Sequence, residues 1–251
     1  MPLRPFQIFF PFSAWRGLVR LWLEVIRAQP DHRAALRQLL TLHADTYLAM
    51  DRGAVDYGDG EHPKHRLTDY HDFFVSRIAV GERVLDVGCG IGSVARDIAQ
   101  ERDATVVGID SSPWALDIAR ARFSHPRVTY LLTDALDYTS ETSFDVVILS
   151  NVVEHIGPRI PFLRSLPERV DARRLLIRVP ALNRHWTVPL ARELGLPHFS
   201  DPDHEVEYLP DSLRDELAQS GWEMATPTLA WGEIWVEARL GVDRGWNGAN
   251  L

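Results

Sequence analysis

The sequence predicts an α/β fold, with a mostly parallel sheet that follows an N-terminal helical extension. From Arg83 onward, short runs of β-branched residues alternate with amphipathic segments, which is the pattern of a parallel sheet. The preceding residues instead carry apolar side chains at helical spacing. Hydrophobic residues at 45% and charged residues at 25% are ordinary globular values and exclude a disordered chain. We therefore expect an extension over 1–80 and a sheet domain over 81–251.

Three helices are expected in the extension. The first covers 13–28, the second covers 31–50 with Asp31 as its N-cap, and the third runs from Pro63 to the residue before Gly81. A loop rich in glycine and aspartate should separate the second helix from the third.

The first of these helices is strongly amphipathic, with arginines on one face and tryptophan and aliphatic residues on the other. We expect its apolar face to pack on the rest of the protein, and the alternative is peripheral membrane contact through 13–28. The N-terminal sequence does not have the usual shape of a signal peptide, and no apolar run approaches the roughly 18–20 residues that span a bilayer. These features predict a cytoplasmic protein, with the inner face of the membrane as the alternative location.

In the sheet domain, five strands and their connecting helices follow one another. The expected strands are 83–87, 105–109, 128–132, 145–149 and 175–179, with helices near 92–101, 112–121 and 159–169. Ser112 followed by Pro113 is an N-cap with proline at the first helical position. Segments 222–225 and 234–239 should form a closing antiparallel pair.

Charge and cysteine content exclude several kinds of protein. The net charge is −8, which argues against a nucleic-acid partner bound through its phosphates. Cys89 is the only cysteine, so neither an intrachain disulfide nor a zinc site built from cysteines is available.

The first strand of the domain runs into a glycine-rich turn, VLDVGCGIGSVA at 84–95. Gly88 and Gly90 permit a tight turn that a ligand can approach closely. Dinucleotide oxidoreductases also use such a turn, but their fingerprint requires Gly or Ala where this sequence has Ser93. A carboxylate at Asp86 would repel a pyrophosphate and suits a ligand with an ammonium group, such as S-adenosyl-L-methionine.

Two further acidic residues follow the next two strands. Asp110 lies 20 residues beyond Gly90, where it can accept hydrogen bonds from ribose hydroxyls. Asp134 can accept a hydrogen bond from an adenine amino group, and Trp114 or Ala135 can pack on the adenine face.

Four blocks, VLDVGCGIG, GID, TDALDY and FDVVILSNVVEHI, together resemble the class I S-adenosylmethionine-dependent methyltransferases over roughly residues 80–240. The resemblance implies a Rossmann-like, doubly wound sheet of seven strands with an antiparallel last strand. It implies S-adenosyl-L-methionine as the cofactor, in a pocket lined by Asp86, Gly88, Gly90, Asp110 and Asp134. Neighbouring residues complete the expected pocket: Cys89, Ser111, Trp114, Ala135 and Asn151.

The SNVVEHI block and the later DHEVEYLPDSLRDELAQSGW block resemble the subgroup that methylates quinols, sugars and other small acceptors. The Asn/Asp-Pro-Pro-Tyr/Phe/Trp signature of base-methylating enzymes is replaced here by SNVV. We therefore expect O-methylation of a small-molecule or glycan acceptor, such as a lipid-linked sugar. The alternatives are N-methylation of a small amine and a cofactor-binding partner without turnover.

Candidate catalytic residues follow the fourth strand. His155 is the candidate general base, and a helical turn starting near Asn151 would place Asn151, Glu154 and His155 on one face. Some related methyltransferases bind a divalent ion through Glu-x-x-Glu-His and a later histidine. Here the pattern is Asn151-x-x-Glu154-His155, with His204 as the later candidate, so a site for Mg²⁺ stays an alternative.

Two loops should complete the site. Arg66, in the polar segment HPKHR, is expected to pair with the methionine carboxylate of the cofactor. Loops around 180–210 follow the fifth strand and should face the acceptor, because open α/β sheets bind ligands at the carboxyl ends of their strands.

Overall fold

The computed structural model describes residues 12–241, which form two compact units. One unit contains residues 12–62 and 189–198, and the other contains residues 63–188 and 199–241. The segment 63–80, which the sequence analysis assigned to the extension, groups with the sheet.

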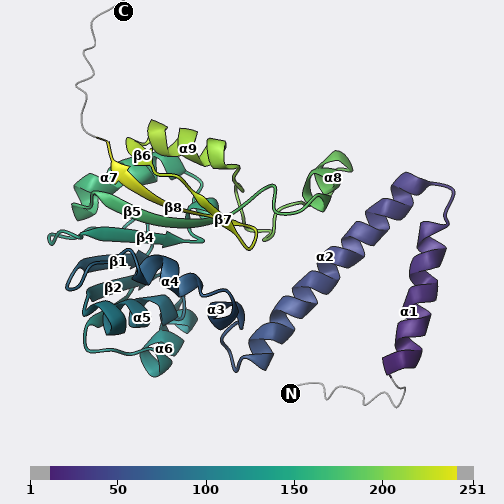
Figure 1. The fold of residues 1–251 in the computed structure, drawn as a ribbon, viewed down its shortest axis with the longest axis horizontal. Coiled ribbons are helices and arrows are strands. Elements are labelled where there is room, and N and C mark those ends of the chain that lie inside the picture. The colour runs from purple at the N-terminus through teal and green to yellow at the C-terminus, as the bar shows by residue number, and fades with distance from the viewer. Residues whose placement is uncertain (1–11, 242–251) are drawn as a thin grey trace, which may run out of the picture. The chain divides into compact units, whose positions relative to one another are not determined.

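The N-terminal unit is a pair of helices, α1 (Phe12–Arg27) and α2 (His32–Tyr57), which contact one another (Figure 1). Asp31 caps α2 as predicted, because its side chain accepts the N–H of Ala34. The predicted end of α2 at residue 50 is wrong. Because no proline interrupts the chain before Pro63, helical hydrogen bonding continues to Gly58, whose N–H bonds to the carbonyl of Ala54.

The single helix predicted from Pro63 to the residue before Gly81 is also wrong. The chain forms two short helices, α3 (Lys64–Leu67) and α4 (Tyr70–Val75). Asp69 separates them with a left-handed backbone conformation at φ 49°, which aspartate tolerates better than most residues. The break turns α4 independently of α3, and Tyr70 and Phe74 are buried.

The sheet confirms the predicted fold class. Its strands are ordered β3-β2-β1-β4-β5-β8-β6, the first five parallel and β8 antiparallel to β5. The described residues contain an eighth strand, β7, which pairs with β8 and which the sequence did not predict. The strands are β1 (Arg83–Val87), β2 (Thr105–Asp110), β3 (Val128–Leu132), β4 (Val146–Ser150), β5 (Arg174–Pro180), β6 (Trp222–Met224), β7 (Thr228–Ala230) and β8 (Glu233–Leu240).

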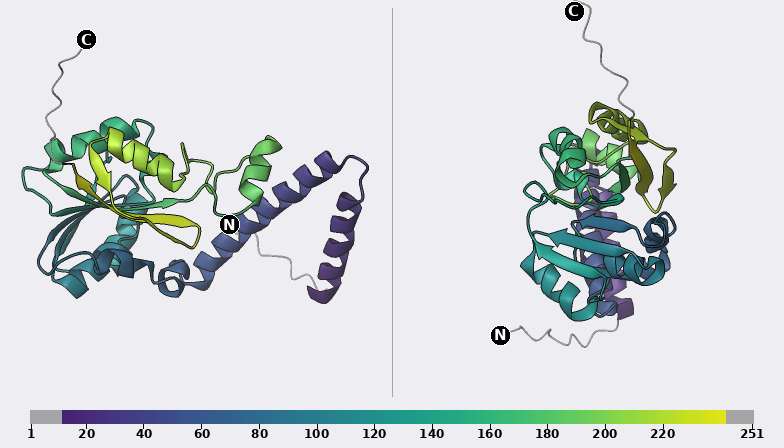
Figure 2. Two further views of the ribbon diagram at one scale, coloured as in Figure 1. Left: turned by 45° about the horizontal axis from the view of Figure 1, so that its top comes forward. Right: turned by 90° about the vertical axis from the view of Figure 1, so that its left-hand side faces the viewer.

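Helices cover both faces of this sheet (Figures 1 and 2). On one face, α5 (Ser93–Arg102) and α6 (Pro113–Arg122) pack with α4, and on the other lie α7 (Arg159–Val170) and α9 (Pro210–Gln219). Successive strand residues alternate between the two cores: Val84 joins the α5 side and Leu85 the α7 side. The short α8 (Thr187–Glu193) follows β5, and its residues from Pro189 onward group with the N-terminal unit.

One edge of the sheet collects the functional candidates. Because β1 to β5 are parallel, Asp86, Asp110 and Ser150 lie at or near the carboxyl ends of their strands along the same edge. The antiparallel β8 begins at this edge, where Glu233 pairs in register with Pro180. Residues distant in the sequence are therefore brought to the edge where ligands bind in open α/β sheets.

Candidate functional site

The glycine-rich turn after β1 leaves part of its backbone open. Gly88 and Gly90 both have positive φ, 65° and 54°. A Cβ on Gly88 would lie 2.6 Å from Val152, in the segment after β4, whereas one on Gly90 would meet nothing within 4 Å. The turn is therefore packed against the β4 segment at Gly88 and open to an approaching ligand at Gly90.

Asp86 is a buried carboxylate with an unused oxygen. It is 2% exposed, and its Oδ2 has no hydrogen-bond partner among the described residues. Burial, together with the charge of Asp110, raises the pKa of Asp86 to about 7. An ammonium group bound beside it would compensate for both the burial and the missing partner.

Asp110 is held by the turns that surround it. Its Oδ2 accepts the N–H of Gly90 at 2.8 Å, and its Oδ1 accepts the N–H of Ser112 at 2.8 Å. Ser112 caps α6 as predicted by accepting the N–H of Ala115, while Ser111 is exposed beside it. Asp110 thus fixes the glycine-rich turn to the start of α6, and carboxylate lone pairs remain for a ribose.

Three more candidates lie around the ends of β2 and β3. Trp114 is exposed on the first turn of α6 and is not a core residue. Asp134 accepts the N–H of Leu136 at 2.7 Å, and Ala135 packs against the core. Cys89 is a packing residue whose thiol pKa is raised by burial, and its N–H donates to the carbonyl of Ile109.

The segment after β4 differs from the predicted helical turn. Asn151 has a left-handed backbone with φ 55°, and a 3-10 turn, η1, covers only Val153–His155. The prediction that Asn151, Glu154 and His155 share one helical face is therefore wrong. Asn151 is instead fixed by its N–H, which donates to the carbonyl of Arg178 at 2.8 Å, and its Oδ1 is buried without a partner among the described residues.

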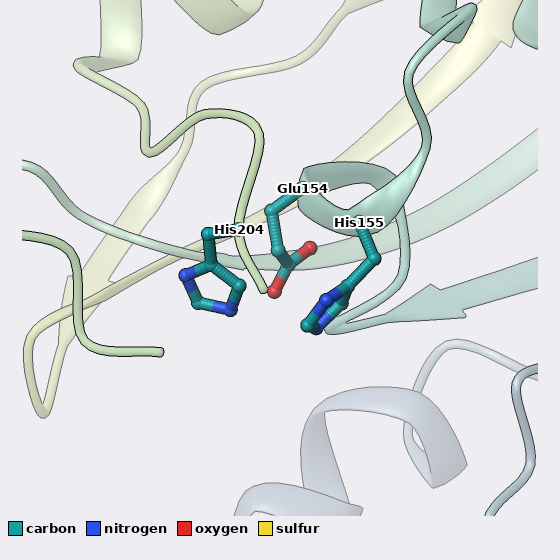
Figure 3. A group of neighbouring side chains, drawn as sticks. All are labelled: Glu154, His155 and His204. Atoms are coloured by element: carbon teal, nitrogen blue, oxygen red, sulfur yellow. The ribbon is translucent and has the colours of Figure 1, made fainter. Parts of the chain in front are cut away.

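Glu154, His155 and His204 come together as a compact group (Figure 3). Ligand atoms of the three side chains all lie within 4.8 Å of one another, and the Glu154 carboxylate lies between the two imidazoles. Glu154 is 0% exposed, and neither of its oxygens has a hydrogen-bond partner in the described part of the chain. Burial raises its pKa to about 7, against the opposing charges of His204 and Arg178.

Glu207, which the sequence analysis missed, orients His204. Its carboxylate has no exposed surface and lies 3.1 Å from Nδ1 of His204, so Nε2 is left for the group with Glu154. Burial by itself would raise the pKa of Glu207, but hydrogen bonds from His204 and Ser200 and the charge of Arg184 hold it below its ordinary value. Four acidic residues, Asp201, Asp203, Glu205 and Glu207, surround His204 in the sequence, and nothing in the pattern distinguishes Glu207 from the other three.

The loop that carries His204 is placed by backbone hydrogen bonds. The N–H of Glu205 donates to the carbonyl of Glu154 at 2.8 Å. Further along, Tyr208 exchanges hydrogen bonds with the end of β5, since its N–H donates to Pro180 and its carbonyl accepts from Leu182. The 3-10 turn after β4 and the loop after α8 are thereby joined at the carboxyl edge.

A second polar network lies beside the glycine-rich turn. Nδ1 of His65 lies 3.0 Å from Nε2 of His71, whose Nδ1 lies 2.6 Å from Asp97. His65 also lies 3.2 Å from the hydroxyl of Ser93, at the start of α5. The side chain of Arg66 is exposed on α3, so its role toward the cofactor stays a prediction, and His65 is the residue of this loop that contacts α5.

Arg178 and Glu233 form an ion pair that the sequence analysis did not anticipate. Both carboxylate oxygens of Glu233 accept from the guanidinium of Arg178, at 2.5 and 2.6 Å. That guanidinium lies 4.2 Å from the ring centroid of Tyr70 and 3.4 Å from the hydroxyl of Ser150. The pair therefore joins β4, β5, β8 and α4 next to Glu154.

Comparisons with known proteins agree with this arrangement. A family described as a methyltransferase domain matches residues 84–168. A mitochondrial ubiquinone biosynthesis O-methyltransferase from Schizosaccharomyces pombe is 32% identical over 155 residues, 57% of this chain and 55% of the relative. The corresponding enzyme from Bradyrhizobium diazoefficiens is 32% identical over 157 residues, 56% of this chain and 61% of the relative. The chain thus spans little more than half the length of these relatives.

Solved structures share the fold. The N-methyltransferase NodS from Bradyrhizobium japonicum, in complex with S-adenosyl-L-homocysteine, matches with a TM-score of 0.53 and 15% identity, over 70% of this chain and 86% of NodS. At this identity the likeness concerns the arrangement of strands and helices.

We predict that Asp86→Asn stabilises the ligand-free protein above neutral pH. The folded-state pKa of Asp86, about 7, lies above its ordinary value of 3.8, so ionisation destabilises the fold progressively as pH rises from 3.8 to about 7. The neutral amide removes this cost, about 2–4 kcal/mol at pH 8, and little changes near pH 4. Urea unfolding at both pH values measures the difference. Asp117→Asn, on the exposed face of α6, is the control, and an equal response in both variants would contradict the prediction.

Proposed function

From the premise that this chain carries a class I S-adenosylmethionine-dependent methyltransferase domain, we propose that it methylates a hydroxyl group of a small molecule or glycan. The observation that carries the proposal is the Glu154 carboxylate, buried without a partner between His155 and His204. This group follows β4, and its neighbour Val152 touches the glycine-rich turn at Gly88. Proton-accepting side chains therefore adjoin the expected cofactor pocket.

The residues of the pocket fit the cofactor. Asp86 offers an unpartnered oxygen to the ammonium group, Gly90 leaves room along the backbone, and Asp110 presents a fixed carboxylate to the ribose. S-adenosylmethionine supplies a methyl group on a sulfonium for in-line transfer. Asp134, Ala135 and Trp114 supply polar and flat surfaces around the end of β3 for the adenine.

Transfer to a hydroxyl oxygen requires removal of its proton. His155 is exposed at the end of η1, and an imidazole is a common general base in enzymes. Glu154 and the His204–Glu207 pair form the polar surroundings that stabilise a protonated imidazole. N-methylation of an amine is the alternative, and it depends less on a base.

His155→Ala should lower kcat for a hydroxyl acceptor by about 10²–10⁴-fold, because the general base is lost. The dissociation constant of S-adenosylmethionine should stay unchanged, since His155 lies on the acceptor side. Release of S-adenosylhomocysteine across a panel of phenols, sugars and amines measures the effect. His43→Ala, which replaces an exposed histidine on α2, is the control. Full turnover by His155→Ala would exclude the base, and cofactor binding without turnover of any acceptor would favour a non-catalytic partner.

The same three side chains also fit a divalent cation. The group offers two imidazoles and one unpartnered carboxylate whose ligand atoms lie within 4.8 Å of one another, which is a common donor set for metals. Glu207 orients His204, as a supporting carboxylate does for a histidine ligand in many metal sites. A bound cation would lower the pKa of a coordinated hydroxyl. Asn151 replaces the carboxylate of the related pattern, and an amide is the weaker ligand for a hard cation.

If the group holds a cation, EDTA will abolish turnover, and Mg²⁺ or Mn²⁺ will restore it. Addition of the cation to the EDTA-treated protein should also raise its Tm, because only the folded state assembles the site. Glu154→Gln and His204→Ala should lose this shift, while Asp203→Asn, exposed in the neighbouring loop, should retain it. If EDTA changes neither turnover nor Tm, the group does not bind a cation, and His155 alone would remove the proton.

We also propose that α1 binds an anionic membrane surface. No helix among residues 12–241 is long and apolar enough to cross a bilayer. Ile26 is the buried apolar side chain of α1, whereas Trp15, Leu18 and Trp22 are exposed on the same face. The polar face carries Arg16, Arg20 and Arg27, and Arg27 pairs with Glu24 at 2.7 Å. Tryptophan beside arginine on an amphipathic helix suits the headgroup region of anionic lipids.

The protein should therefore cosediment with vesicles that contain phosphatidylserine, and much less protein should cosediment with neutral phosphatidylcholine vesicles. Replacement of Arg16 and Arg20 by Gln should weaken binding by about 1 kcal/mol per charge at low salt. Replacement of His43 and Asp45 on α2 by Ala is the control. Absence of cosedimentation with both kinds of vesicle would favour packing of the apolar face within the protein.

A further inference from the structure

A small pocket opens beside the carboxyl end of β5. It has a volume of about 230 Å³, smaller than the ~300–1,000 Å³ of pockets for drug-sized ligands. One wall is the segment after β5 and the other is the β7–β8 hairpin; the N–H of Ala181 donates to the carbonyl of Gly232 and ties the two together. The lining residues are Ala181, Asn183, Arg184, Leu229, Ala230, Trp231, Gly232 and Glu233.

Trp231 lines this pocket in an unfavourable backbone conformation. Ala230 pairs with Glu233, so Trp231 and Gly232 form a two-residue hairpin turn, with φ values of 55° and 79°. Positive φ at both positions defines a turn that favours Asn-Gly, and tryptophan in this conformation is uncommon. The ring is nevertheless 71% exposed, so burial in the core does not explain it. A strained residue with an exposed aromatic ring at a pocket indicates a role in ligand binding.

The charged residues of the pocket are already neutralised by neighbours. Arg184 pairs with Glu207. The two carboxylate oxygens of Glu233 accept hydrogen bonds from two guanidinium nitrogens of Arg178. Both side chains are therefore fixed in place and retain hydrogen-bonding capacity, while neither presents an uncompensated charge. With Asn183, the pocket offers donors and acceptors to a ligand that carries no charge.

The pocket is joined to the Glu154 group by two short chains of contacts. Arg184 pairs with Glu207, which in turn holds His204. Glu233 pairs with Arg178, whose guanidinium contacts Ser150, the last residue of β4. The pocket and the Glu154 group are therefore connected through Arg184, Glu207 and His204.

We propose that this pocket binds a neutral, hydroxyl-rich ring, a pyranose unit of the acceptor. The flat face of Trp231 packs on the C–H face of the sugar, and Asn183, Arg184 and Glu233 bind its hydroxyls. An anion would find no uncompensated positive charge in this pocket. A phenol would leave most of these polar groups without hydrogen-bond partners, which would lower its affinity. The identification of this sugar as the methyl acceptor rests on the proposed function, whereas the binding site itself does not.

The test compares Trp231→Asn and Trp231→Phe in the full chain. Binding of methyl glycosides of glucose, mannose, galactose and rhamnose is measured by calorimetry and saturation-transfer NMR, with catechol as the aromatic comparator. We expect at least one glycoside to bind the wild type with a Kd in about the millimolar range. Trp231→Asn should weaken that binding at least about tenfold and Trp231→Phe by less. Because Asn suits the turn, Trp231→Asn should also raise Tm by about 2–4 °C, which separates lost binding from lost folding.

Two results would overturn the proposal: no glycoside binds the wild type, or Trp231→Asn binds the same glycoside equally well. Stronger binding of catechol than of every glycoside would also overturn it, in favour of an aromatic acceptor. Calorimetry with S-adenosylmethionine and an assay of S-adenosylhomocysteine release keep the two proposals distinct. Glycoside binding without methylation supports the sugar site but removes its identification as the methyl acceptor, while methylation of another hydroxyl without glycoside binding does the reverse.

Discussion

The buried ion pair between Arg178 and Glu233 supports the edge of the sheet on which the candidate site is built. Arg178 is 5% exposed, and its guanidinium makes two hydrogen bonds to one carboxylate and lies over the rings of Tyr70 and Trp235. Its backbone carbonyl accepts the N–H of Asn151. Removal of either charge would leave the other buried without compensation, which is far more costly than loss of an exposed pair. The ends of β4, β5 and β8 are thus fixed relative to one another by one interaction.

Around this fixed edge, two carboxylates are buried in a way that costs stability. Asp86 has one unpartnered oxygen and Glu154 has two, and burial raises both pKa values to about 7. A protein under selection for stability alone would pair or replace such groups. They lie at the proposed ammonium subsite and between two imidazoles, where a bound ligand, a proton or a cation would supply the missing partner.

Most strands could be predicted from the sequence because each corresponds to a local run of β-branched or apolar residues. The strand β4, for example, is buried on both faces and therefore reads as a continuous apolar segment. The strand β7 was not predicted, and the break at Asp69 depends on a left-handed residue that the sequence pattern does not reveal. The helix α2 continues past residue 50 because single glycine and aspartate residues lower helix propensity only modestly and no proline interrupts the helix.

The sequence by itself determined the fold class and the residues expected to bind the cofactor, because these follow a strand, a glycine-rich turn and a helix that are contiguous in the chain. Only the tertiary structure decided which distant side chains assist them. Glu207 is one of several acidic residues near His204, and its role arises from the hydrogen bond between Glu205 and Glu154. Glu233 reaches the site because β8 runs antiparallel and begins where β5 ends. Such contacts are set by strand order and direction, which local sequence does not encode.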